Sequence, residues 1–335
     1  MLDISGGGLG VGLGLAQLGH EVRYRGPEVA PGEPPSEFIE QRRQLIDHHF
    51  VGEARCGDGD DLLVVNGSFA DELGAMHMQL HFDQDFCAEA PLRPTRNALA
   101  YPARLQFVLE WASAASRVVV VDGSDARTMR EPAFEQMPHA TLLAREVGRT
   151  EQTAWRAFPF LYNPVLLWLE ALRPEQEWLV PAERRAPQWD WAFCGTIDHP
   201  RYGDRRRRGL AEVQQTWPGG RGVVATTAPF VDVLRVLQSV RCGIDLPGAG
   251  EICFRLHEYL SLGVPVLRPA PFGVMLPAGV QRAIVAAPEQ LAGLDVDAVR
   301  AIYRARYAPR AAAAILLATV GASGTVTLPA HPAIG

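Results

Sequence analysis

Cysteine is scarce in this sequence, and its arrangement excludes two ways of stabilising a fold. Five cysteines occur among 335 residues, and no two of them form a CxxC pair. An odd count in a long chain argues against a disulfide framework, and the missing CxxC spacing argues against a structural zinc site. The sequence therefore predicts reduced thiols in a cytoplasmic protein, with no bound metal.

Long apolar runs and a leader segment are also missing. The best apolar candidate, residues 158–172, is interrupted by proline and polar residues, whereas a membrane-spanning helix needs about 20 apolar residues in succession. The first residues contain no basic segment ahead of an apolar one, which is the pattern of a secretory signal. We therefore expect no membrane span.

A strong charge of one sign is absent as well. Asp and Glu total 38 against 32 basic residues, so the formal net charge is −6. A mildly acidic chain has no overall attraction to nucleic acid, so no nucleic-acid partner is expected. The local exception is a run of four arginines at residues 205–208. We interpret this run as the solvated start of a helix.

The residues that are present indicate an α/β fold in two halves. A chain of 335 residues is long enough for two domains, each with its own core. We expect a first lobe at residues 1–165, a second lobe at 166–320 and a frayed tail at 321–335.

The first half opens with a strand, a glycine-rich segment, a helix and a second strand at residues 20–24, which is how a doubly wound sheet begins. Valine-rich runs at residues 62–65 and 118–121 are each followed by turn residues, as is typical of buried parallel strands. Apolar and polar spacing predicts helices at residues 36–48 and 99–115.

The second half repeats the alternation of strand and helix. Strands are expected at residues 191–194, 222–226, 240–246 and 264–267. Helices are expected at residues 205–215, 230–239, 251–262 and 295–307, and a last one from residue 311. Strands that alternate with helices predict a second parallel sheet.

Residues 245–267 have a layout that suits an anion. A strand ends, a glycine turn with Gly248 and Gly250 follows, and a helix then begins. Free N–H groups and a partial positive charge at a helix N-terminus favour a diphosphate. Arg255 adds a forked donor for phosphate oxygens. Glu258 lies three residues further on, and so shares its helix face and could accept hydrogen bonds from ribose hydroxyls.

This segment resembles the donor-site signature of the GT-B glycosyltransferases. The pattern R-x-x-E-x-L-x-x-G-x-P-V is similar to that of the exostosin-type and spore-protein-type group, with a donor motif like that of the "glycosyl transferases group 1". The matching residues are Arg255, Glu258, Leu260, Gly263, Pro265 and Val266. Residues 121–125, 142–146, 158–160 and 191–196 are similar to further segments of that group, so that the resemblance runs from residue 121 to 267.

The resemblance implies two Rossmann-like lobes, the GT-B fold, with a central cleft. It implies a hexosyltransferase-like enzyme that moves a sugar from a nucleotide-sugar to the hydroxyl of an unknown acceptor, without a metal or other cofactor. The residues that it assigns to donor binding are Gly195, Thr196, Gly248, Gly250, Glu251, Arg255 and Glu258. It also implies that the C-terminal helix crosses back to the first lobe.

One departure from the family pattern leaves the stereochemistry open. Many retaining members carry two glutamates with seven residues between them, whereas Glu251 and Glu258 have six residues between them. Glu251 is therefore not assigned a catalytic role, and both retention and inversion remain possible.

The N-terminal glycines admit three interpretations. In the GT-B interpretation Gly8 and Gly10 belong to a loop on the acceptor side. An alternative is an NADP- or FAD-dependent oxidoreductase, but the third glycine, Gly14, falls one position too late for G-x-G-x-x-G, and the second strand ends in Tyr24-Arg25 without an acidic residue. The third interpretation is a purely structural turn.

Candidates for a catalytic base are Asp122, Asp125 and His49. The two aspartates follow a predicted strand, where open α/β sheets place functional groups, and His49 ends a predicted helix. The polar cluster at residues 81–85 is interpreted as a solvated loop rather than a set of metal ligands. Because no base is clearly indicated, a catalytically silent GT-B-like binding subunit is a further alternative.

Overall fold

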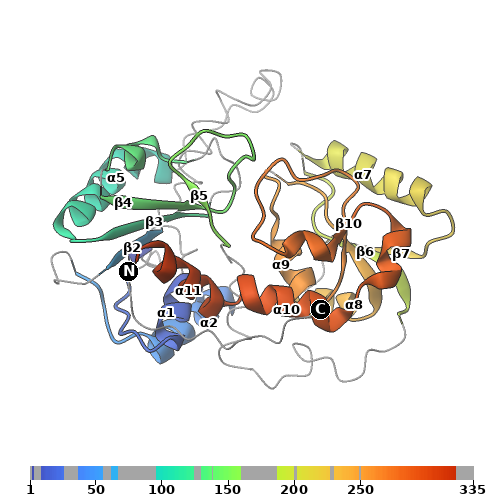
Figure 1. The fold of residues 1–335 in the computed structure, drawn as a ribbon, viewed down its shortest axis with the longest axis horizontal. Coiled ribbons are helices and arrows are strands. Elements are labelled where there is room, and N and C mark those ends of the chain that lie inside the picture. Colours follow the sequence, from blue (N-terminus) through green and yellow to red (C-terminus); the bar gives the residue numbers. More distant parts are fainter. Residues whose placement is uncertain are drawn as a thin grey trace.

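The structure is a computed structural model, and it describes residues 2–3, 9–25, 37–55, 62–66, 96–123, 130–137, 139–159, 187–199, 202–226, 230–248 and 250–321. These residues form a mixed α/β protein with two parallel sheets, each of five strands. Figure 1 shows one sheet on each side of the molecule. The predicted α/β class is thus confirmed.

The first sheet has the strand order β1-β2-β3-β4-β5, and every neighbouring pair is parallel. Its strands are β1 (Leu2–Asp3), β2 (Leu63–Asn66), β3 (Val118–Asp122), β4 (Ala140–Ala144) and β5 (Arg156–Ala157). The helices of this half are α1 (Leu9–Gln17), α2 (Glu37–His49), α5 (Arg96–Ala114) and the 3-10 helix η2 (Pro132–Gln136).

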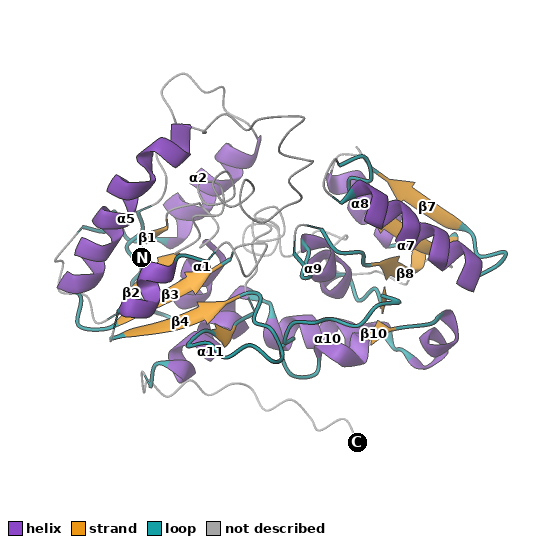
Figure 2. Cartoon of the chain, turned by 90° about the horizontal axis from the view of Figure 1, so that it is seen from above, coloured by secondary structure: helices purple, strands orange, loops and turns teal. Residues whose placement is uncertain are grey.

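Alternate side chains of β3 face two different helical layers. Val118 and Val120 pack in a cluster with Trp111 of α5, whereas Val119 and Val121 pack in a cluster with residues of α1 and α11 (Pro309–Thr319). Successive side chains of a strand point to opposite faces, so helices cover both faces of this sheet (Figure 2). The valine run is therefore a buried parallel strand, as the sequence predicted.

The second sheet has the order β10-β9-β8-β6-β7, again with parallel neighbours. Its strands are β6 (Trp189–Cys194), β7 (Gly222–Ala225), β8 (Val240–Ile244), β9 (Val266–Leu267) and β10 (Ile284–Val285). Its helices are α7 (Gly203–Thr216), α8 (Phe230–Leu237), α9 (Phe254–Ser261) and α10 (Val296–Arg306), with the 3-10 helices η3 (Val280–Ala283) and η4 (Pro288–Gly293).

The chain reverses its direction of progress across this sheet between β6 and β8. It moves from β6 outward to β7, and then returns to place β8 on the other side of β6. Each such reversal leaves a crevice outside the carboxyl ends of the two central strands, where open α/β sheets bind ligands. The topology therefore predicts a ligand site at the loops after β6 and β8.

The predicted elements of the second half all occur, with shifted ends. α9 begins at Phe254, three residues after the predicted start, because Cys253 keeps an extended backbone with φ −90° and ψ 162° as the N-cap. In the first half, the strand expected at residues 20–24 is reduced to an isolated parallel bridge between Arg23 and Gly52. β5 and β10 each have two residues and are too short to give a sequence pattern.

The glycine-rich N-terminal segment differs from the expected loop. Gly10 lies buried within α1, which begins at Leu9, whereas Gly8 lies outside the described residues. A Cβ on Gly14 would lie 1.9 Å from the carbonyl oxygen of Pro309 and 2.8 Å from Cβ of Ala313. Gly14 therefore serves the close packing of α1 on α11, so that the last helix does return to the first sheet.

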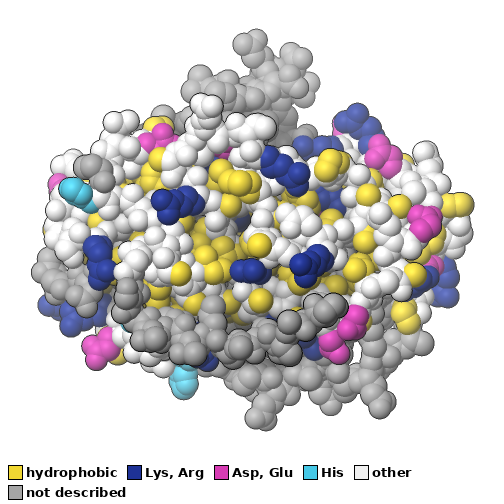
Figure 3. Space-filling model, viewed as in Figure 1, with side chains coloured by type: hydrophobic (Ala, Val, Ile, Leu, Met, Phe, Trp, Pro, Cys, Tyr) yellow, Lys and Arg dark blue, Asp and Glu magenta, His cyan; other side chains and the backbone are white. Residues whose placement is uncertain are grey.

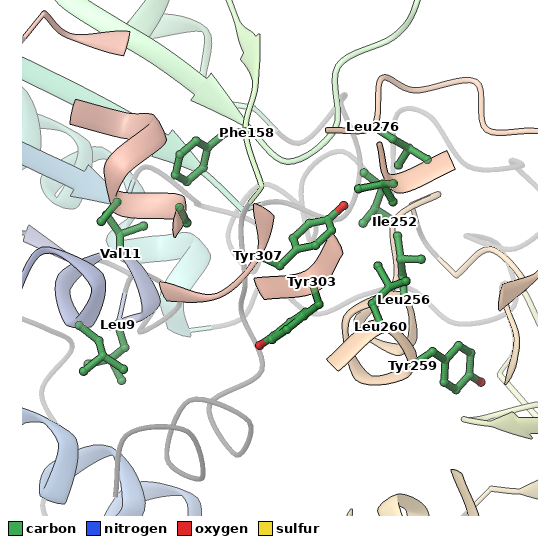
Figure 4. Packing of buried hydrophobic residues seen from close by; sticks show 14 of the residues in the cluster. Leu9, Val11, Phe158, Ile252, Leu256, Tyr259, Leu260, Leu276, Tyr303 and Tyr307 are labelled. Atoms are coloured by element: carbon green, nitrogen blue, oxygen red, sulfur yellow. The ribbon is translucent and has the colours of Figure 1, made fainter. Parts of the chain in front are cut away.

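The core is continuous between the two sheets. Tyr303 of α10 and Tyr307, directly after α10, belong to one cluster with Leu9 of α1 and Leu256 of α9. Figure 4 shows the two tyrosines between the side chains of α1 and those of α9. The two halves of the chain therefore share buried apolar contacts.

Candidate anion-binding site

Two loops meet at the reversal point of the second sheet. Gly195 and Thr196 follow β6, and residues 245–250 follow β8. Two buried arginines reach these loops from different helices, Arg206 from α7 and Arg255 from α9. Arg205 of α7, which is exposed, also donates to the carbonyl oxygen of Gly248, and Arg268 pairs with Asp245 at 2.7 Å.

Arg255 occupies the first turn of α9 and is only 7% exposed. Its Nη2 donates to the carbonyl oxygen of Leu246 at 2.6 Å, and its guanidinium carbon lies 4.7 Å from the centre of the Phe193 ring. Its Nε has no hydrogen-bond partner among the described residues. Burial opposes the charged form, but Cys253 and other neighbours act more strongly together and raise the pKa of Arg255. The guanidinium is thus charged, and one donor remains to be satisfied.

Arg206 is also buried, at 4% exposure. Its Nη1 donates to the carbonyl oxygen of Thr196 at 2.5 Å, and its Nε donates to that of Pro247 at 3.2 Å. Its guanidinium carbon lies 4.0 Å from the centre of the Tyr202 ring. The expectation of a solvated helix start is therefore wrong for Arg206, because α7 turns this side chain toward the loops, although the arginines beside it are exposed.

The two guanidiniums act on each other electrostatically. Burial and the nearby charge of Arg255 lower the pKa of Arg206. Both side chains donate to backbone carbonyls, which carry only partial charge, and the charges of Asp245 and Glu258 also act on Arg255. Buried like charges are unfavourable unless an opposite charge joins them. The pair therefore favours binding of an anion with more than one negative charge.

Two glycines make room for these guanidiniums. A Cβ on Gly195, whose φ is +150°, would lie 2.4 Å from Nη1 of Arg255. A Cβ on Gly248 would lie 2.9 Å from Nη2 of Arg206 and 3.2 Å from Sγ of Cys253. Both glycines were among the residues predicted to bind a donor, and each lies against a buried arginine.

The backbone N–H groups of these glycines are less available than the sequence suggested. Gly195 donates its N–H to the carbonyl oxygen of Ala225 at 2.8 Å, and Gly248 donates to that of Gly250 at 3.0 Å. An N–H that is bonded within the chain offers little to a ligand. In this conformation the positive side of the site therefore comes from arginine side chains rather than from these amides.

The two predicted glutamates lie in different surroundings. Glu258 is buried one turn after Arg255 on α9, at 8% exposure, and its charge acts on Arg255. Glu251 accepts the N–H of Gly273 at 2.7 Å and pairs with Arg268 at 3.3 Å. Glu251 therefore helps to shape the loop before α9, while Glu258 shares the helix of Arg255.

Glu146, which sequence reasoning did not select as a functional residue, reaches the same loop from the first sheet. It follows β4, is 4% exposed, and accepts the N–H of Ile252 on Oε1 at 2.6 Å. Burial raises the pKa of Glu146 to about 7, against the opposing effects of Arg145 and of the N–H groups of Ile252 and Glu251. In the sequence, the only indication of its role was its position in segment 142–146, which is similar to a segment of the GT-B group.

The backbone also joins the segments that follow β4 and β9. Gly148 and Val274 form an antiparallel bridge. Met275 donates its N–H to the carbonyl oxygen of Val147 at 2.7 Å, and Arg149 donates to that of Gly273 at 3.1 Å. Segments that leave the carboxyl ends of both sheets therefore meet beside the loop that carries Glu251.

The predicted catalytic bases belong to the other half of the fold. Asp122 is buried at the end of β3, where its carbonyl oxygen accepts the N–H of Arg145 at 2.9 Å. His49 ends α2, and burial followed by the charge of His48 lowers its pKa. Asp125 and the polar cluster at residues 81–85 lie outside the described residues. Asp122 and His49 thus belong to the half of the fold that carries the first sheet, whereas the arginine pair belongs to the half that carries the second.

Among the residues that the structure describes, no group of three or more His, Cys, Asp or Glu side chains could hold a metal ion. No helix in the same ranges is both long and apolar enough to cross a membrane.

No family model matches the chain, and no curated protein matches it in sequence. Among solved structures, the chain is similar to "Spinosyn Forosaminyltransferase SpnP", a glycosyltransferase by its name, with 12% identity and a TM-score of 0.33 over 96% of this chain and 99% of that chain.

Proposed function

We propose that this protein is a glycosyltransferase of the GT-B type that binds a nucleotide-sugar at the arginine pair. The observation that carries the proposal is the pair itself, Arg206 and Arg255, buried at the reversal point of a parallel sheet. A diphosphate supplies two adjacent negative groups, which would add charge-assisted hydrogen bonds to two guanidiniums that donate to backbone carbonyls. The proposed lobes are residues 1–165 and 166–320, with a cleft between them.

The reaction follows from the chemistry of such a donor. An acceptor hydroxyl attacks the anomeric carbon, the bond from that carbon to the diphosphate oxygen breaks, and the hydroxyl proton passes to a base. Negative charge develops on the leaving diphosphate, so Arg206 and Arg255 would stabilise the transition state more than the ground state. Glu258, one turn after Arg255, is placed to accept hydrogen bonds from ribose hydroxyls.

The motif supports the same assignment from the sequence side. Arg255 and Glu258 of the R-x-x-E-x-L-x-x-G-x-P-V pattern both lie buried on α9. Gly263 ends that helix with φ +69°, a conformation that glycine favours. By contrast, the competing oxidoreductase interpretation relies on the N-terminal glycines. Of these, Gly14 lies in close contact with α11.

A binding experiment with matched arginine variants tests the proposal. Arg206 is buried and Arg207 is exposed on the same helix, so Arg206→Met and Arg207→Met remove the same charge from two different environments. We expect one of UDP, GDP, ADP, CDP or dTDP to bind, as measured by calorimetry. Arg206→Met and Arg255→Met should each weaken binding about 10- to 100-fold, the range for charge-assisted hydrogen bonds, and Arg207→Met should leave it unchanged.

Three outcomes separate the alternatives. Equal weakening by Arg206→Met and Arg207→Met would mean a general charge effect and no built site. Binding of NADP or FAD that is retained in Arg255→Met would indicate an oxidoreductase instead of a glycosyltransferase. Binding of a nucleoside diphosphate without release of that diphosphate from any matching nucleotide-sugar would identify a silent binding subunit.

A further inference from the structure

A carboxylate that follows the first sheet's strand β4 contacts the loop directly before α9. Glu146 accepts the N–H of Ile252 at 2.6 Å, and Ile252 lies two residues before Phe254, where α9 begins. N–H groups at a helix N-terminus bind anions. Glu146 therefore places an anion of the chain's own directly before the helix whose first turn carries Arg255.

A second observation marks this helix end as a ligand site. Arg255 lies in the first turn of the same helix, it is buried, and its Nε has no hydrogen-bond partner in the described ranges. Arg206 adds a further buried guanidinium from α7. These donors are present while Glu146 is bound to the loop, so the carboxylate does not satisfy the site completely.

We propose that Glu146 is an internal competitor of the donor diphosphate, holding the loop before α9 until the donor arrives and giving up that contact when it binds. This inference rests on the proposed function, because it assumes a diphosphate at Arg206 and Arg255. It adds regulation to that site, since a residue of the first sheet then controls access to a loop of the second.

The charged groups around Glu146 fix the sign of the expected pH dependence. Arg145, its neighbour after β4, favours the ionised form, and Glu251 on the contacted loop disfavours it. Arg130 donates to the backbone carbonyl of Glu146 and pairs with Glu151 at 2.8 Å. Because burial dominates, the pKa of Glu146 is raised to about 7. Ionised Glu146 holds the loop more strongly and repels phosphate, so competition increases as the pH rises through about 7.

The experiment compares the wild type with Glu146→Gln between pH 6 and pH 8.5. Glutamine keeps an acceptor for the N–H of Ile252 but has no charge. The ligand is the nucleoside diphosphate selected by the arginine experiment, and its own titration cancels in the ratio of the two affinities. We expect Glu146→Gln to bind about tenfold more tightly at pH 8.5, where one pKa unit corresponds to one factor of ten, and the advantage to vanish near pH 6.

Glu110→Gln is the matched control, because Glu110 is exposed on α5 of the same half and its substitution removes the same charge. It should leave the affinity unchanged at every pH. Weaker binding by Glu146→Gln, or a ratio that does not change with pH, would overturn the competition while leaving Arg255-dependent binding, and hence the proposed function, intact. If no nucleoside diphosphate bound to either protein, both proposals would fall together.

Discussion

At the scale of single residues, the positively charged side chains of the site are all arginines. The sequence contains no lysine, so all 32 basic residues are arginines. A guanidinium presents several donors in a fixed plane, which suits carbonyl and phosphate oxygens at the same time. Arg206 and Arg255 use part of that plane for the loops after β6 and β8. A flexible ammonium would not be held in place in this way.

Gly195→Ala tests whether the shape of the loop positions Arg255. The new Cβ would lie 2.4 Å from Nη1 of Arg255, so we expect the guanidinium to move and the diphosphate affinity to fall about tenfold or more, on the order of one lost charge-assisted hydrogen bond. Gly219→Ala is the control, because its φ is also positive, at +84°, but no atom lies within 4 Å of the added Cβ. Calorimetry should show a loss of affinity for the first variant only. An equal loss in both would assign the effect to backbone strain.

At the scale of secondary-structure elements, close packing explains the glycine-rich start of the chain better than a nucleotide loop does. α1 and α11 approach so closely that the position of a Cβ on Gly14 is taken by the backbone of Pro309. This contact joins elements almost 300 residues apart in the sequence, so no local pattern predicts it. It also explains how the last helix is fixed to the first sheet.

Gly14→Ala separates packing from helix propensity. Alanine would stabilise an isolated helix by up to about 1 kcal/mol relative to glycine, whereas overpacking typically destabilises by about 1–3 kcal/mol. Because the clash is with backbone, we expect a net decrease in the free energy of unfolding, measured with urea. Gly293→Ala has no atom within 4 Å of the added Cβ and should be nearly neutral. A more stable Gly14→Ala protein would contradict the packing in this structure.

At the scale of the whole molecule, the two sheets are joined by a common core and by contacts at their carboxyl edges. Tyr303 and Tyr307 pack between α1 and α9, and the bridge between Gly148 and Val274 links the segments after β4 and β9. On the face seen in Figure 3, apolar side chains gather toward the middle of the molecule. We therefore expect the two sheets to unfold together.

The shared core also contains a buried histidine that makes stability depend on pH. His257 lies 4.6 Å from the ring centre of Tyr307, and burial together with Arg145 lowers its pKa to about 3. Below pH 6.5 the unfolded chain binds a proton that the folded protein excludes until about pH 3. The free energy of unfolding should therefore fall by about 1.4 kcal/mol per pH unit over that interval.

His257→Phe should remove this part of the slope, as measured by urea unfolding at pH 7 and pH 5. Its control is His20→Phe, because His20 is exposed. Glu146 acts in the opposite direction, since its raised pKa makes stability fall as the pH rises from 4.5 to about 7. That effect is common to all three proteins and cancels in the comparison. Identical slopes for wild type and His257→Phe would show that the histidine is not buried neutral.

The sequence by itself determined the order and type of most elements. Helical spacing, valine runs and turn residues are local, so they predicted β3, the strands β6 to β9, the helices α7 to α11, and the shared helix of Arg255 and Glu258. The short strands β5 and β10 were not predicted. Local patterns also fixed Gly263 as the end of α9.

Only the tertiary structure decided which polar residues form the site. Four successive arginines look alike in the sequence, and packing of α7 on the sheet is what buries Arg206 and leaves the others exposed. Glu146 meets Ile252 across 106 positions of sequence, and Gly14 meets Pro309 over a still longer interval. Burial and pKa depend on neighbours brought together by folding, and the periodicity of one segment contains no information about them.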